Sequence, residues 1–209
     1  MADGHDSYGR IAQYYDAVIE PLNAPLRRIA VAFHPPVPGM RVLDVGCGTG
    51  AHLDAYVESG AVCTGIDMSP AMLAVARGRL GTTATLDIGD ATNLPYSDDA
   101  FDLTFTAMFL HELDPGVRTT ILDEMLRVTD PAGRVLVIDY RVGPMRWQGR
   151  AWRIVSTVAE RIAGARHYRN WRRYLAGGGV PSIVPAGGTI EREKIVAGGN
   201  LAIWLIEKT

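Results

Sequence analysis

A glycine-rich turn between an apolar run and a helix constrains the fold of this chain most. Residues 42–45 are apolar apart from Asp44, as expected of a buried strand, and Gly46-Cys47-Gly48-Thr49-Gly50 follows at once. Glycine lets the backbone turn sharply and lets a ligand approach where a Cβ atom would collide. The pattern therefore predicts a strand, a tight ligand-binding turn and then a helix over residues 51–58.

The spacing of the glycines separates two kinds of cofactor site. A dinucleotide-binding turn has the spacing G-x-G-x-x-G and places a pyrophosphate at the N-terminus of the helix. Here Gly46, Gly48 and Gly50 give G-x-G-x-G, and Asp44 stands just before the turn. A carboxylate at that place repels a pyrophosphate, but it suits a cofactor that carries an ammonium and a sulfonium group.

Strand patterns alternate with helix patterns from the glycine turn to residue 140. We expect strands at residues 61–67, 83–88, 101–109 and 133–140, and helices at residues 71–80 and 117–128. Such alternation is typical of a parallel sheet with helices on both faces. Near the end, residues 190–197 and 201–206 flank Gly198-Gly199-Asn200, which predicts an antiparallel hairpin at the edge of the sheet.

The segment from Asp44 to Gly50 resembles the first S-adenosylmethionine motif of the class I methyltransferases. Further matches follow in the family's order within residues 42–140, namely Asp67, Gly89-Asp90-Ala91, Leu94-Pro95 and Thr106-Ala107. The resemblance implies an α/β fold, a Rossmann-like seven-stranded mixed sheet flanked by helices, and S-adenosylmethionine as the cofactor. The likeness is to the small-molecule branch that includes the ubiquinone and menaquinone biosynthesis methyltransferases.

The same resemblance implies which residues hold the cofactor. Asp67 would accept hydrogen bonds from both ribose hydroxyls, although it could instead only cap the following helix. Asp90 would accept from the adenine amine, and Met68 would pack on the adenine ring. The other contacts, to the methionyl group, the sugar and the adenine edge, fall to Asp44, Gly46, Cys47, Gly48, Gly50, Ala91, Thr106 and Ala107.

His111 is the candidate catalytic residue. It follows the fourth expected strand, beside the point where an open parallel sheet binds ligands, and a histidine there could take a proton from an attacking hydroxyl or thiol. The alternative is a structural histidine. Methyl transfer from a sulfonium needs little acid or base help, because the leaving group departs neutral and alignment can supply about 7 kcal/mol. Tyr14 and Tyr15 are candidate walls of the substrate site.

A basic segment lies between the fifth strand and the hairpin. Residues 145–176 carry eight arginines against a single acid, Glu160, and Ala151, Ile154, Val155, Val158 and Ile162 would line one side of a helix. We interpret the segment as a lid that packs on the sheet with its arginines in solvent. The alternatives are an anionic substrate held by arginine, or contact with an anionic membrane. His167, Tyr168 and Trp171 are candidate substrate contacts near the pocket mouth.

Length and composition limit the remaining possibilities. We expect residues 1–209 to form a single methyltransferase domain, with a helical N-terminal cover over residues 1–40 and a helical insert over residues 142–186. A net charge of −2 gives no chain-wide cationic field, so no nucleic-acid partner is expected. The polar opening and the lack of a leader predict a cytoplasmic protein, with Cys47 and Cys63 reduced and buried.

These observations favour an S-adenosylmethionine-dependent methyltransferase that acts on a small molecule. One alternative is a protein that binds S-adenosylmethionine without catalysis. The other is a nicotinamide-dependent oxidoreductase, which predicts a third glycine one residue beyond Gly50 and a parallel sixth strand in place of the hairpin.

Overall fold

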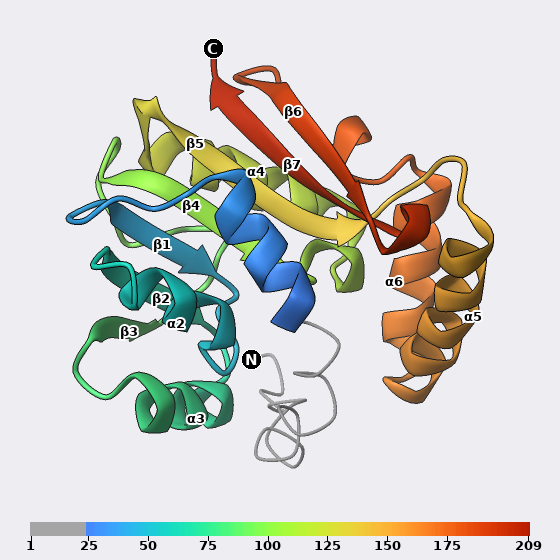
Figure 1. The fold of residues 1–209 in the computed structure, drawn as a ribbon, viewed down its shortest axis with the longest axis horizontal. Helices are drawn as coiled ribbons and strands as arrows, with labels where there is room; N and C mark the ends of the chain where they lie inside the picture. The colour runs from blue at the N-terminus through green and yellow to red at the C-terminus, as the bar shows by residue number, and fades with distance from the viewer. Residues whose placement is uncertain (1–23) are drawn as a thin grey trace.

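A computed structural model describes residues 24–209, in which seven strands form one sheet in the order β3-β2-β1-β4-β5-β7-β6 (Figure 1). Strands β1 to β5 run parallel, and β7 runs antiparallel to both β5 and β6. The predicted α/β class, the mixed sheet and the terminal hairpin are therefore confirmed, with β6 at the edge. The strands are β1 Arg41–Val45, β2 Val62–Asp67, β3 Ala84–Ile88, β4 Phe101–Ala107, β5 Thr129–Tyr140, β6 Gly188–Val196 and β7 Leu201–Lys208.

Prolines and capping residues determine where several helices begin and end. Residues 24–33 are helical and stop before the Pro35-Pro36 pair, which cannot continue a helix. Before the helix at residues 70–80, the side chain of Ser69 accepts a hydrogen bond from the amide of Met72 at 3.1 Å, so Ser69 is the N-cap of that helix. The other helical elements are α2 Ala51–Val57, α3 Pro70–Leu80, α4 Pro115–Val128, α5 Trp147–Ile162, α6 Ala165–Ala176 and the short 3₁₀ turns η1 Leu110–Glu112, η2 Val180–Ser182 and η3 Ala197–Gly199.

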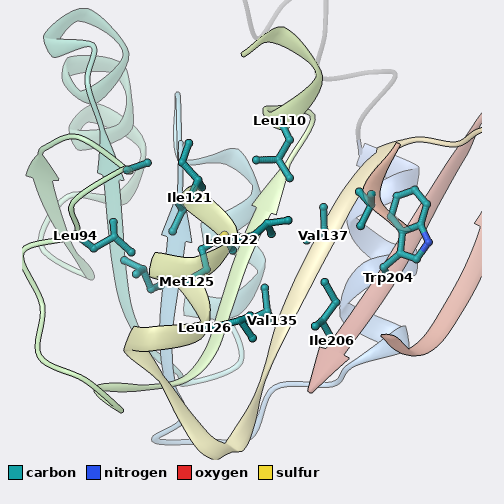
Figure 2. Close-up of a cluster of buried hydrophobic side chains, with 14 of the residues drawn as sticks. Leu94, Leu110, Ile121, Leu122, Met125, Leu126, Val135, Val137, Trp204 and Ile206 are labelled. Atoms are coloured by element: carbon teal, nitrogen blue, oxygen red, sulfur yellow. The ribbon is translucent and has the colours of Figure 1, made fainter. Parts of the chain in front are cut away.

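Both faces of the sheet carry a hydrophobic core, because successive side chains of a strand point to opposite faces. On one face Val42 packs with Leu26 of the first helix and Leu53 of α2. On the other face Leu43 and Val45 lie in a cluster with side chains from α4 and α6. Figure 2 shows this second cluster, in which the apolar side of α4 faces β5 and β7. The labelled side chains include Ile121, Leu122, Met125 and Leu126 of α4, Val135 and Val137 of β5, and Ile206 of β7.

Helix α5 turns its apolar side outward, so the expectation that this side packs on the sheet is wrong. The exposed fractions of Trp147, Ile154, Val155, Val158 and Ile162 lie between 51 and 81%. The buried residues of α5 are Gly149 and Glu160, which occupy the opposite side of the helix. Gly149 lies against Gly198 and Glu160 faces His111 and His167, and these contacts decide which side of α5 is turned inward.

Two further expectations concern the membrane and the cysteines. Within residues 24–209 no helix combines the length and the hydrophobicity needed to cross a bilayer. Cys47 and Cys63 are both buried and free, as predicted.

Candidate active site

The predicted cofactor residues meet at one edge of the sheet. Strands β1, β2, β3 and β4 are parallel neighbours, so their carboxyl ends lie along the same edge. Asp44 lies within β1, Asp67 ends β2, Asp90 follows β3 and Thr106 lies near the end of β4. The strand order reverses between β1 and β4, and open α/β sheets bind their ligands at such a point.

The glycine turn is shaped by packing at two of its positions and left open at the third. Gly46, Gly48 and Gly50 all have left-handed φ angles, of 73°, 53° and 73°. A Cβ atom on Gly46 would lie 2.9 Å from the ring of Phe109, and one on Gly50 would lie 2.8 Å from Leu80. A Cβ atom on Gly48 would meet no atom of residues 24–209 within 4 Å, so this part of the structure leaves the space beside its backbone to a ligand.

Asp67 connects the glycine turn to the start of α3. Its Oδ2 accepts a hydrogen bond from the amide of Gly48 at 2.9 Å, and its Oδ1 accepts one from the amide of Ser69 at 2.8 Å. The residue therefore does brace the beginning of the helix, and it also holds the turn. A carboxylate can accept more hydrogen bonds than these two, so bracing and ribose binding are compatible. Met68 beside it is 70% exposed, and its contact with the adenine ring stays a prediction.

Asp44 places a second carboxyl group under the same turn. The side chain is buried, and burial raises the pKa of Asp44 well above its ordinary value, with the charge of Asp67 acting in the same direction. A cation at this place would lower the pKa of Asp44 again, because an opposite charge favours the ionised form of a buried carboxyl group. The pair of acids thus fits the ammonium and sulfonium groups of S-adenosylmethionine and disfavours a pyrophosphate.

The remaining predicted contacts line the same edge. Asp90 is exposed, and its Oδ1 accepts hydrogen bonds from the amide and the hydroxyl of Thr92 at 2.8 and 2.7 Å. Ala91 is buried in the core beneath it. Thr106 is buried near the end of β4, with Ala107 as the last residue of that strand. These positions agree with the predicted roles, which stay predictions.

His111 lies in η1 and is 3% exposed. Its Nδ1 is 2.8 Å from Oδ1 of Asp139, and its Nε2 is 3.4 Å from Oε1 of Glu160. Burial by itself lowers the pKa of His111, but the two carboxylates raise it, to about 10 in balance. Both ring nitrogens therefore face protein carboxylates, and the predicted catalytic role of His111 stays a prediction.

The sequence did not identify the partners of His111. Glu160 of α5 reaches His111 on one side and His167 of α6 on the other, where Nε2 of His167 is 2.7 Å from its Oε2. Burial raises the pKa of Glu160, but the two histidines lower it by more, so that the resulting pKa is about 2. Two signals were present in the sequence: Glu160 is the single acid among eight arginines in residues 145–176, and Asp139 interrupts an apolar strand.

The candidate substrate residues have different surroundings. Trp171 is 3% exposed and packs in the core, and Tyr168 stacks on it with 5.8 Å between ring centroids. His167 is partly exposed and belongs with His111 and Glu160. Tyr14 and Tyr15 lie outside the described residues.

Comparisons with known proteins agree with this geometry. Residues 42–133 match the family described as "Methyltransferase domain". The demethylmenaquinone methyltransferase of Renibacterium salmoninarum is 37% identical over 123 residues, which are 57% of this chain and 51% of that protein. An uncharacterized methyltransferase of Synechocystis, sll0829, is 28% identical over 176 residues, which are 78% of this chain and 80% of that protein.

The fold comparison covers more of the chain. The crystal structure of a SAM-dependent methyltransferase from Aquifex aeolicus has a TM-score of 0.60 and 18% sequence identity, covering 86% of this chain and 88% of that one.

The nicotinamide-dependent oxidoreductase alternative fails on topology, because β7 is antiparallel to β5 where that alternative needs a parallel strand. The chain spans about half the length of the demethylmenaquinone methyltransferase that it matches. Residues 42–133 therefore match the methyltransferase domain family, within a chain that has the fold of a solved S-adenosylmethionine-dependent methyltransferase and whose sequence resembles the demethylmenaquinone enzymes.

Proposed function

We propose that this chain transfers the methyl group of S-adenosylmethionine to a small-molecule acceptor. The observation that carries the proposal is the left-handed glycine turn, open beside Gly48, with the carboxyl groups of Asp44 and Asp67 held next to it. When bound, the cofactor supplies a methyl group that is made electrophilic by the sulfonium. The residues at the carboxyl edge would have to align the acceptor with this methyl group and exclude water, because alignment supplies most of the help that such a transfer needs.

The family resemblance implies the roles of the cofactor residues, and their places at the carboxyl edge support these roles. Asp67 binds the ribose hydroxyls while it braces the turn, Asp44 faces the methionyl ammonium, and Asp90 binds the adenine amine. The acceptor approaches beyond the end of β4, on the side of η1 and α6. A small-molecule acceptor is supported by the likeness to the demethylmenaquinone methyltransferase.

The proposal is tested by the ligands that the purified chain binds. We expect calorimetry to show one S-adenosylmethionine per chain and no binding of NAD, because the acidic turn repels a pyrophosphate. We then expect label to pass from methyl-labelled S-adenosylmethionine to at least one acceptor in a panel of quinone precursors, phenols and small amines. Binding of NAD in place of S-adenosylmethionine would contradict the assignment, and cofactor binding without transfer to any acceptor would favour a non-catalytic binding protein.

The outward face of α5 supports contact with an anionic membrane that presents an apolar acceptor. The exposed aliphatic side chains share α5 with the exposed Arg150 and Arg161, and the exposed Arg146 is the N-cap residue of the helix. Such a helix can lie in the membrane interface with its apolar side buried and its arginines on the lipid headgroups.

Removing aliphatic side chains from this face is expected to weaken vesicle binding. The double variant Ile154→Ser and Ile162→Ser should lower the partition coefficient onto phosphatidylglycerol vesicles by about tenfold, because two exposed aliphatic groups no longer enter the apolar layer. Co-sedimentation measures the effect. Ile195→Ser is the matched control, since Ile195 is an aliphatic side chain that is 51% exposed on β6 and is not part of the helix. Equal partitioning of the double variant and the control would rule out membrane contact through α5.

A further inference from the structure

Three side chains from separate elements meet beneath the helical insert. His111 of η1, Glu160 of α5 and His167 of α6 each offer a ligand atom, and these atoms lie within 4.8 Å of one another. We name the three residues the His–Glu–His cluster. His111 and Glu160 are buried, and His167 is partly buried. The assigned methyltransferase activity uses none of the three as a cofactor contact.

Each histidine of the cluster is oriented by a carboxylate on its other ring nitrogen. Nδ1 of His111 is 2.8 Å from Oδ1 of Asp139, and Nδ1 of His167 is 3.4 Å from Oε2 of Glu112. The Nε2 atoms of both rings therefore face Glu160, at 3.4 and 2.7 Å from its two oxygens. Histidines that bind metals are commonly held in this way, because the carboxylate fixes the ring and makes the free nitrogen more basic.

Glu160 retains a buried oxygen that the described residues do not satisfy. Its Oε1 accepts a hydrogen bond from the hydroxyl of Tyr140 at 2.8 Å. Its Oε2 is buried and makes no hydrogen bond within residues 24–209, although Nε2 of His167 lies 2.7 Å away as an ion-pair contact. This oxygen therefore faces an imidazole nitrogen without a hydrogen bond between them, and a metal ion bound by both atoms would satisfy the buried oxygen.

The charges around the cluster also favour a cation. Asp139, Glu160 and Glu112 bring three carboxylates to two imidazole rings. The guanidinium of Arg118 is nearby, but it donates to backbone carbonyls, at 3.0 Å to Leu110 and 2.7 Å to Asn170. A divalent ion between the rings would offset the excess of negative charge at the centre of the cluster.

We propose that the His–Glu–His cluster binds one divalent first-row transition-metal ion, with Zn²⁺ as the best-fitting probe, through Nε2 of His111, Nε2 of His167 and the carboxylate of Glu160. Two imidazoles and one carboxylate suit zinc, whereas magnesium and calcium prefer oxygen ligands alone. Ligand atoms around a tetrahedral zinc ion lie about 3.3 Å apart. The cluster reaches this spacing when its widest separation, at most 4.8 Å, closes by small side-chain rotations.

The ion would connect the helical insert to the edge of the sheet. Its ligands come from η1, α5 and α6, so binding ties both insert helices to the segment that follows β4. Three protein ligands leave a fourth position on a tetrahedral ion for water or for an oxygen atom of an acceptor.

Metal titration of the full chain, prepared without a polyhistidine tag and stripped with a chelator, tests the proposal. We expect calorimetry to show one Zn²⁺ per chain, Co²⁺ to give visible ligand-field bands, and Zn²⁺ to raise the melting temperature. His167→Gln and Glu160→Gln should abolish the stoichiometric site. Glu112→Gln should weaken it by about 10- to 100-fold, because it removes only the carboxylate that orients His167.

His34→Gln is the matched control, since His34 lies beyond the cluster at the end of the first helix, and it should bind Zn²⁺ as the wild type does. Absence of a stoichiometric zinc site in the wild-type chain overturns the proposal, whatever the variants do. Unchanged zinc affinity in folded His167→Gln, checked by circular dichroism, overturns it as well. S-adenosylmethionine binding measured on the same stripped sample is independent of these outcomes, so the two proposals can fail separately.

Discussion

Replacing Asp67 by alanine is expected to weaken S-adenosylmethionine binding by about 1–3 kcal/mol, which is a loss of affinity of about 5- to 150-fold. The side chain would lose its hydrogen bonds to the ribose. It would also lose the hydrogen bonds that it accepts from the amides of Gly48 and Ser69, at 2.9 and 2.8 Å. The turn would then no longer be held in its binding shape. Calorimetric titration of the cofactor measures the loss.

Two further variants separate cofactor binding from general damage. Asp123→Ala removes an exposed aspartate of α4, a helix that carries none of the proposed cofactor residues. This variant should bind S-adenosylmethionine with unchanged affinity. Asp67→Asn keeps one acceptor oxygen and should fall between the wild type and Asp67→Ala. An Asp67→Ala chain that binds the cofactor with wild-type affinity would show that Asp67 only braces the helix.

Gly149→Ala is expected to destabilise the protein by about 1–3 kcal/mol. Alanine normally stabilises a helix relative to glycine, but at this position the added methyl group meets the backbone of Gly198, with its carbonyl carbon at 2.7 Å. Backbone atoms of η3 cannot rotate away as a side chain can, so α5 has to move outward. Thermal or urea unfolding measures the change, which should appear as a lower midpoint.

Gly78→Ala is the matched control with the opposite sign. Gly78 is an exposed residue of α3, and a Cβ atom there would meet no atom of the described residues within 4 Å. The substitution should therefore stabilise the protein by about 0.5–1 kcal/mol. If both substitutions stabilise the chain equally, the close contact between α5 and η3 does not exist in solution.

The sequence by itself determined the sheet and its cofactor edge, because both follow from patterns that are local in the chain. The strand–turn–helix order around Gly46 and Gly50 and the hairpin around Gly198 both appear where expected. Parallel strands joined by helices carry their carboxyl ends to one edge, so Asp44 and Asp67 had to meet there once the fold class was known.

Only the tertiary structure decided the environment of His111 and the orientation of α5. His111, Glu160 and His167 come from three elements whose mutual placement depends on how the insert packs, and no periodicity in the chain encodes that distance. Helical spacing predicted an apolar side for α5 correctly, but periodicity cannot tell whether such a side faces inward. The backbone contact at Gly149 and the buried carboxylate of Glu160 settle the direction, since a close backbone approach and an ionised group with two imidazole partners each permit a single orientation of the helix.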